Sequence, residues 1–225
     1  SLLLFAWQMA MASSLGVPQH LDFLEIGTSS FNTLLQSASN ATVGLSVDMM
    51  RPYLDRLPNP AHVTKVHAAV SDDDDDGTNA TIFFVHPDDI ESYDLPWWLR
   101  GCNMIARPHP DAIRDLTKAN MLHLLRNESV RLSSVSKLLA SHNVKTIQYF
   151  KLDVEGFELK VFRSLLRATK AMPSLWPHVI SYESRWLTPH DRYEIQQTLI
   201  EYKYVPFTEK DPKPKRRREN VLPDT

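Results

Sequence analysis

Short apolar runs alternate along this chain with segments in which apolar residues recur at helical spacing. The clearest run surrounds Tyr149 and continues to Val154, and Gly156 then interrupts it. Beyond that glycine, apolar positions recur at the spacing of one helix face, at Leu159, Val161, Phe162, Leu165 and Leu166. This pattern predicts a buried strand, a tight turn and a helix.

The same alternation covers most of the chain. It predicts strands over 21–26, 43–47, 63–70 and 179–182, an extended piece over 81–85, helices beginning near Ser29 or Ser30 and over 135–139 and 193–200, and an extended segment over 202–207. Strands that alternate with helices form mostly parallel sheets covered on both faces. With 225 residues, 43% of them hydrophobic, the chain can bury a sizeable core. We therefore predict a single α/β domain over residues 1–210.

Residues 86–132 break this rhythm. They are rich in Pro, Asp, His and Trp, and they offer little periodicity before Met121. Because loops on a rigid scaffold often carry substrate contacts, we interpret the segment as an insertion that caps the substrate crevice. Trp97, Trp98 and Arg100 would supply flat apolar and cationic surface there. The alternative is that the tryptophans complete a core.

Composition narrows the function classes. The formal net charge of -2 argues against a dedicated polyanion binder. One cysteine excludes an intramolecular disulfide, and no Cys/His cluster has the spacing of a zinc site. Basic residues concentrate in the tail 211–225, at Lys213, Lys215, Arg216, Arg217 and Arg218. We expect a flexible, solvated tail; a sorting signal, a nucleic-acid contact or an anionic-membrane contact is the alternative, and the case for nucleic acid is not strong.

The sequence leaves localisation open. The apolar segment 2–11 is shorter than the roughly 20 residues of a membrane-spanning helix, so we expect a helix packed on the core rather than a truncated anchor. Three glycosylation sequons, at Asn40, Asn79 and Asn127, matter only in a secretory compartment. A cytoplasmic protein is expected if the chain is complete, and a secretory-pathway protein if an anchor precedes it. Membrane association and oligomeric state stay undecided.

Acidic residues follow several predicted strands. They are Glu25, Asp48, Asp72, Asp153, Glu155 and Glu183. The carboxyl ends of strands in an open α/β sheet face the ligand crevice, so we expect these acids around one ligand. Two acids at alternate positions beside an apolar run are costly unless they are used, which favours a site at Asp153 and Glu155 over a solvated surface turn.

The spacing of these residues suits an adenosine-type ligand. Gly27 after the first strand permits close backbone approach, and Asp48, roughly twenty residues on, suits the two hydroxyls of a ribose. A dinucleotide site would need several glycines, and the turn after the first strand carries one. S-adenosylmethionine has no pyrophosphate, and the acids complement its positive sulfonium and amino groups.

Four segments, in their order and spacing, resemble the FkbM family of S-adenosylmethionine-dependent methyltransferases. The segments are 23–30, 46–48, 68–72 with Gly77, and, most specific of all, 149–158. The resemblance implies a class I methyltransferase fold, Rossmann-like, with a mostly parallel seven-stranded sheet and helices on both faces. It also implies O-methylation of a hydroxyl on a sugar, a glycan or a small metabolite, which would be the acceptor partner.

The resemblance also assigns residues to the cofactor. These are Glu25, Gly27, Thr28, Ser29, Asp48, Met49, Ser71 and Asp72. Thr28 and Ser29 stand where the family commonly has Ala and Asn, which alters the cofactor loop. Asp48 matches the acid that holds the ribose, and Met49 would line the adenine slot. Asp72 matches the segment at the adenine edge, and the other aspartates that follow it are expected to form a self-repelling solvent loop.

Methyl transfer is an in-line displacement, so alignment is the main task, and a hydroxyl acceptor must also lose its proton. Asp153 is the first candidate to accept that proton or to orient the acceptor, and Glu155 is the second. Lys151 would pair with either acid and lower its pKa. Glu158 is expected to cap or bridge, and each histidine to be an ordinary surface or core residue. No metal site is predicted, because a cation between Asp153 and Glu183 would rest on two carboxylates.

Two other function classes remain open. A binding module that keeps the fold without the chemistry would account for the altered loop at Thr28 and Ser29. A nucleotide-dependent oxidoreductase is disfavoured by the missing glycines.

Overall fold

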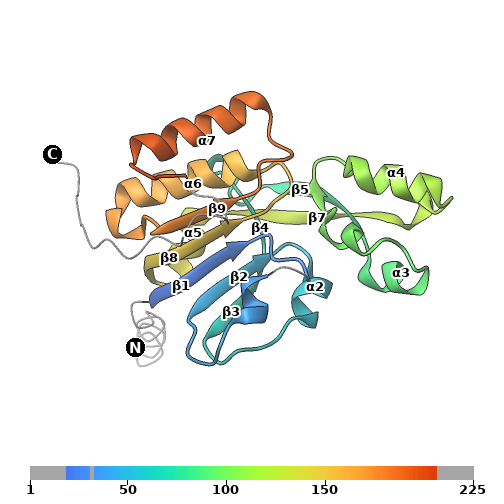
Figure 1. The fold of residues 1–225 in the computed structure, drawn as a ribbon, viewed down its shortest axis with the longest axis horizontal. Helices are drawn as coiled ribbons and strands as arrows, with labels where there is room; N and C mark the ends of the chain where they lie inside the picture. The colour runs from blue at the N-terminus through green and yellow to red at the C-terminus, as the bar shows by residue number, and fades with distance from the viewer. Residues whose placement is uncertain (1–18, 31–32, 207–225) are drawn as a thin grey trace, which may run out of the picture.

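A five-stranded parallel sheet forms the centre of the protein (Figure 1). The computed structural model describes residues 19–30 and 33–206. The strands lie in the order β3-β2-β1-β8-β9, with bounds β1 Gln19–Ile26, β2 Gly44–Asp48, β3 Val63–His67, β8 Val144–Leu152 and β9 Val179–Tyr182. Each neighbouring pair is parallel. All five carboxyl ends therefore meet at one edge of the sheet.

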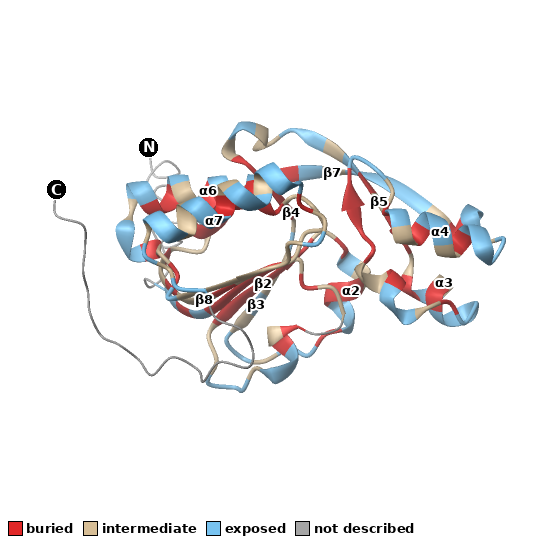
Figure 2. Ribbon diagram, turned by 45° about the horizontal axis from the view of Figure 1, so that its top comes forward, coloured by how far each residue is buried: buried red, intermediate tan, exposed pale blue. Residues whose placement is uncertain are grey.

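Helices cover both faces of this sheet. On one face lie α5 (Val135–Ser141), α6 (Glu158–Ala171) and α7 (Pro189–Glu201), which share an apolar core with Leu24 and Phe150. On the other face, α2 (Arg51–Arg56) and the 3-10 turn η1 (Leu34–Ser37) pack against Phe23 and Tyr149. Adjacent residues of a strand point to opposite faces, which is why these neighbours join different cores. Buried residues gather on the central strands β1, β2 and β8 and on the sheet-facing side of α6 (Figure 2).

A second, four-stranded sheet extends to one side (Figure 1). Its order is β4-β7-β5-β6, with β4 Ala69–Ser71, β5 Asn79–Val85, β6 Met104–Ile105 and β7 Leu125–Ser134. Beyond it lie α3 (Pro87–Ser92), α4 (Pro110–Lys118) and the 3-10 turns η3 (Trp97–Gly101) and η4 (Leu122–Leu124). These elements bury a small core of their own, which consists of Val85, Ile90, Leu95, Leu99, Cys102, Ala112, Leu116 and Leu124.

The α/β class and the parallel sheet with its helices are confirmed, but the sheet is not seven-stranded in the part of the chain that the structure describes. The run 63–70 was expected to be one strand, and it breaks at Ala68. Before the break, β3 pairs with β2; after it, β4 pairs with β7 in the second sheet. The Ala68 amide instead donates to the carbonyl of Asp48. The predicted run therefore serves two sheets rather than extending one.

Two other expectations about local structure were wrong. The segment after β1 was expected to begin a helix at Ser29 or Ser30, and between Thr33 and β2 the structure has only the turn η1. The Thr33 hydroxyl and the Leu34 amide both donate to Glu25, which holds this segment at the end of β1. The segment 202–207 was expected to be extended, and its first residues, 202–203, form a turn after α7, while residue 207 lies outside the described residues.

The segment 86–132 has regular structure, and its last residues belong to β7. Trp97 and Trp98 are 60% and 43% exposed, so the alternative that they complete a core is wrong. The apolar segment 2–11 and the basic tail 211–225 lie outside the described residues. Within those residues, no helix has both the length and the apolar character that crossing a membrane requires.

Candidate functional site

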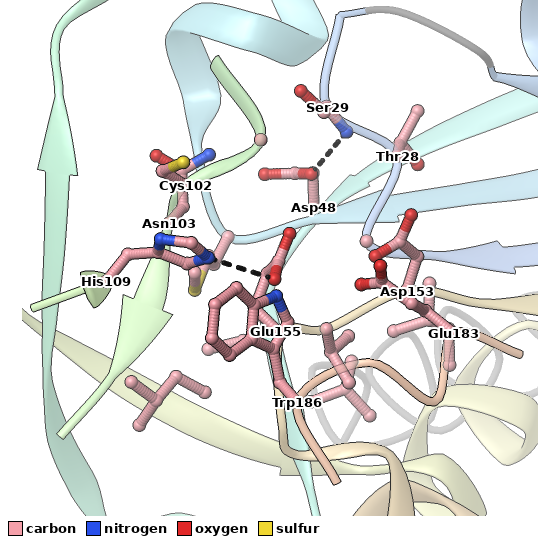
Figure 3. A pocket seen from close by; sticks show the side chains of 18 of the residues that line it. Thr28, Ser29, Asp48, Cys102, Asn103, His109, Asp153, Glu155, Glu183 and Trp186 are labelled. Atoms are coloured by element: carbon pink, nitrogen blue, oxygen red, sulfur yellow. Dashed lines mark hydrogen bonds and ion pairs between the residues drawn. The ribbon is translucent and has the colours of Figure 1, made fainter. Parts of the chain in front are cut away.

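A cavity of about 270 Å³ opens at the carboxyl ends of the central strands. Its volume is close to the lower end of the range of small-molecule sites, roughly 300–1,000 Å³. Three groups of residues line it. The ends of the central strands contribute Ile26, Gly27, Thr28, Ser29, Asp48, Met49, Lys151, Asp153, Val154, Glu155 and Glu183, and the break between the two sheets contributes Ala68, Ala69 and Val70. The segment 86–132 and the loop after β9 contribute Trp98, Gly101, Cys102, Asn103, Ile105, His109, Asp111, Arg185 and Trp186. Segments far apart in the sequence thus build one cavity (Figure 3).

Gly27 brings the end of β1 into contact with the end of β8. Its φ is +84°, and a Cβ at this position would lie 1.6 Å from the carbonyl oxygen of Asp153. That oxygen is part of the backbone and has no room to move aside. Only glycine combines this backbone conformation with so close an approach. Gly27 was expected to admit the cofactor; the structure adds that it admits the neighbouring strand.

Thr28 and Ser29 fasten the loop after β1 to the end of β2. The Thr28 hydroxyl donates to the Val47 carbonyl at 3.1 Å, and it lies 2.8 Å from the hydroxyl of Ser46. The Ser29 amide donates to Asp48 Oδ2 at 2.7 Å (Figure 3). Ser29 has φ of +51°, a left-handed conformation that few non-glycine residues adopt. The loop after β1 is therefore held against the end of β2 by these hydrogen bonds.

Asp48 is buried and oriented by backbone donors. Besides the Ser29 amide, its carboxylate accepts a hydrogen bond of 2.6 Å from the Met50 amide. Burial raises the pKa of Asp48 to about 6, while these two amides lower it. Each oxygen keeps a second lone-pair direction. The side chain can thus receive two hydroxyl donors from a ligand without reorientation.

Glu25 lies behind the cavity wall and is not among the cavity-lining residues. It is fully buried and accepts hydrogen bonds from the Thr33 hydroxyl and the Leu34 amide. Lys151 Nζ lies 2.9 Å from Glu25 Oε1. Glu25 therefore binds the loop after β1 and the side chain of Lys151. The cofactor contact that the resemblance assigns to Glu25 would need a different position of its side chain, inside the cavity.

Three carboxylates of the cavity lining lie close together. Asp153, Glu155 and Glu183 each offer one oxygen, and these oxygens lie within 4.8 Å of one another. Burial, followed by repulsion from the other two acids, raises the pKa of Glu183 to about 8. Burial also raises the pKa of Asp153 and of Glu155, while Lys151 opposes the rise at Asp153. At neutral pH the cluster therefore holds protons as well as negative charge.

The same cluster is the place where the described residues could hold a cation. Three carboxylate oxygens are ligands of the kind that hard divalent ions take. The sequence pointed to Asp153 and Glu183 alone, and the structure adds Glu155. The raised pKa values show that the three acids can share protons instead, so the geometry alone does not define a metal site.

Glu158 shapes the turn that carries these acids. Its carboxylate accepts hydrogen bonds from the amides of Val154 at 3.0 Å and Gly156 at 2.9 Å. The side chain is buried, and burial raises its pKa to about 7. Glu158 therefore closes the turn on itself, as the expected capping role requires.

Ser71 and Asp72 are not brought to the cavity. Ser71 donates a hydrogen bond to Asp75, and Asp72 forms an ion pair with Arg167 of α6. The expected adenine contact is thus not supported, because the break at Ala68 turns the following residues toward α6. The acidic run is not a self-repelling solvent loop either, since each of its aspartates pairs with a basic side chain: Arg167 pairs with Asp72, Asp73 and Asp74, Lys160 with Asp75, and Lys137 with Asp76.

Several cavity residues were not predicted from the sequence, and four of them carry polar or aromatic side chains that shape the site. His109, Asn103, Arg185 and Trp186 line the cavity, and His109 Nε2 lies 3.4 Å from Glu155 Oε2 (Figure 3). The available signals were an aromatic residue close behind the strand end at Glu183 and a histidine before Pro110, at a helix start. Neither signal distinguishes a site residue from a packing residue. The insertion does line the cavity, and its role as a substrate cap stays a prediction.

Comparison with known proteins bears on the matched part of this site. A family model described as the methyltransferase FkbM domain matches residues 55–206, which is more than half of the chain. The matched segment includes the turn with Asp153 and Glu155, and it begins after Gly27 and Asp48. Neither the curated proteins nor the solved structures yield a match.

Proposed function

Because the chain belongs to the FkbM methyltransferase family, we propose that it transfers a methyl group from S-adenosylmethionine to a hydroxyl oxygen of a sugar, a glycan or a small metabolite. The observation that carries the proposal is the convergence of Asp48 and Asp153, from separate strand ends, on one cavity. The family supplies the methyltransferase function. The donor and the oxygen acceptor are the part that we propose, and the acidic lining of the cavity supports the donor.

The charge of the cavity supports this donor. Its acidic lining residues are Asp48, Asp111, Asp153, Glu155 and Glu183, and its Lys and Arg residues are Lys151 and Arg185. An excess of carboxylates favours a ligand with positive charge, such as a sulfonium and an amino group. Asp48, held by two backbone amides, would bind the ribose hydroxyls, with Met49 beside the base. These residues suit S-adenosylmethionine, which has no pyrophosphate and therefore needs no pyrophosphate-binding loop.

The donor supplies an activated methyl carbon, and the protein aligns the acceptor oxygen behind it. Asp153 would accept the hydroxyl proton as the oxygen attacks, because burial has raised its pKa and made it a stronger base. Glu155 would orient the same hydroxyl from the other side of the turn. The positive charge of Lys151 lowers the pKa of Asp153, so that a larger fraction of the molecules carries an ionised Asp153.

Calorimetric titration of S-adenosylmethionine into the protein and into Asp48→Ala tests the donor. We expect binding to the unaltered protein and its loss in the variant. Asp72→Ala is the matched control, because Asp72 also follows a strand and pairs with Arg167 outside the cavity. Absence of binding to the unaltered protein would overturn the proposal.

Transfer of labelled methyl from S-adenosylmethionine to a panel of sugars, glycans and hydroxylated metabolites tests the reaction. Incorporation at an oxygen supports O-methylation, and incorporation at a nitrogen or carbon contradicts it. Donor binding without transfer to any acceptor would support the alternative of a non-catalytic binding module.

A further inference from the structure

His109 reaches the turn of Glu155 from the start of a distant helix. It is the N-cap residue of α4, and its Nδ1 accepts a hydrogen bond of 3.1 Å from the Asp111 amide. A ring nitrogen that accepts a hydrogen bond carries no proton, so the ring proton is on Nε2. Nε2 is the atom that lies 3.4 Å from Glu155 Oε2. The cap thus fixes which nitrogen presents a donor to the carboxylate.

Glu155 needs such a partner. Among the described residues, its Oε2 accepts no hydrogen bond, and it is shielded from solvent. Its φ of +52° places a non-glycine residue in the left-handed region, which few such residues adopt. A donor at 3.4 Å becomes a hydrogen bond after a shift of a few tenths of an ångström, and such contacts often tighten when ligands bind.

The ring of His109 is held on its other side as well. It packs edge-on against Trp186, with ring centroids 4.6 Å apart. The guanidinium of Arg185 lies over the ring of Trp186 and forms an ion pair with Asp111. Asp111 is the residue whose amide donates to His109 Nδ1. The start of α4 and the loop after β9 are therefore joined by two contacts around one buried ring.

We propose that His109 is a positioning residue that holds the Glu155 carboxylate toward the acceptor through its Nε2 proton; this rests on the proposed methyl transfer. Capping alone does not require histidine, because asparagine is among the best N-cap residues. An asparagine would keep the cap and be too short to reach Glu155. The additional reach of the imidazole ring is what the cavity uses.

His86 provides a matched comparison. It is the N-cap of α3 and accepts the Asp88 amide on Nδ1, as His109 does at α4. Its nearest carboxylate partner, Asp88, belongs to its own helix, and His86 does not line the cavity. His86→Asn and His109→Asn thus make the same change at two equivalent caps, one of which faces the site.

The first test is nuclear magnetic resonance of the histidine rings, which needs no methyl transfer. We expect His109 to be protonated on Nε2, and its Nε2 proton signal to shift in Glu155→Gln, where the charged partner is lost. The signals of His86 should not move. The opposite tautomer, or a His109 signal indifferent to Glu155→Gln, would overturn the proposal whether or not the protein is a methyltransferase.

The second test separates positioning from folding. We expect His109→Asn to keep its melting temperature and to bind S-adenosylmethionine as the unaltered protein does, and to lose turnover about 10- to 100-fold in kcat. His86→Asn should match the unaltered protein in all three measurements. Equal kcat in His109→Asn and the unaltered protein would show that the histidine only caps the helix.

Discussion

Lys151 and Glu25 are directly opposite each other on the neighbouring parallel strands β8 and β1, and their side chains form an ion pair of 2.9 Å. Glu25 is fully buried, and the side chain of Lys151 is 16% exposed. The pair links the end of β1, where the cavity loop with Gly27 begins, to the end of β8, which Asp153 follows. A change at one partner therefore acts on both sides of the site.

The first prediction concerns this ion pair. Lys151→Met leaves the Glu25 carboxylate buried without its cation, and we expect a loss of about 3–5 kcal/mol in the free energy of unfolding. Glu25→Gln combined with Lys151→Met should cost less than Lys151→Met alone. Urea denaturation of the single and double variants measures both effects. Additive losses would contradict a coupled pair.

The second prediction concerns the contact between Gly27 and Asp153. Gly27→Ala places a methyl group against a backbone oxygen, and we expect a loss of about 1–3 kcal/mol in stability together with weaker donor binding. Gly77→Ala is the control, since Gly77 also has positive φ and its added methyl would meet only a flexible arginine. Equal effects of the two variants would assign the loss to backbone conformation alone.

The third prediction concerns proton transfer. Asp153→Asn keeps the shape of the side chain and removes its basicity, so we expect turnover to fall about 10²- to 10⁴-fold. Donor affinity, measured by calorimetry, should change little because Asp48 is untouched. Normal turnover in this variant would transfer the proton-accepting role to Glu155.

The fourth prediction is a pH dependence of stability without ligand. The pKa values of Asp48, Glu158 and Glu183 are raised in the folded protein, to about 6, 7 and 8. The folded state therefore binds more protons than the unfolded state between their ordinary pKa values and these raised values. The stability that they contribute is present below about pH 4 and is lost as the pH rises toward 8.

Urea denaturation at pH 5 and pH 8 measures this loss. We expect a lower midpoint at pH 8, and a smaller difference in Glu183→Gln, which cannot ionise. A midpoint that rises with pH over this interval would contradict the raised pKa values.

The strand-end acids were predictable because the signals are local. An apolar run followed by Asp153 and Glu155, or by Asp48, marks both a strand and its carboxyl end, and the fold then brings these ends together. All three residues line one cavity in the structure. Their roles in binding and catalysis stay predictions.

The rest depends on contacts between distant segments. His109 reaches Glu155 and Trp186 only because the second sheet brings the start of α4 to the cavity, and no periodicity in 86–132 reveals that path. Asp72 was misplaced for a related reason. The run 63–70 looks continuous in hydrophobicity, yet β4 leaves the central sheet to pair with β7, which turns Asp72 toward Arg167.

Because of the break at Ala68, the residues that line the cavity come from two different sheets. Gly27 and Asp48 sit at the ends of central strands, whereas Asn103 and His109 are carried by the second sheet and its helices. The segment between β5 and β7 lies outside β1 and β2, and it contributes Trp98, Asn103 and His109 to the cavity. In the proposed methyl transfer, this division would let the second sheet set acceptor preference while β1 and β2 hold the donor.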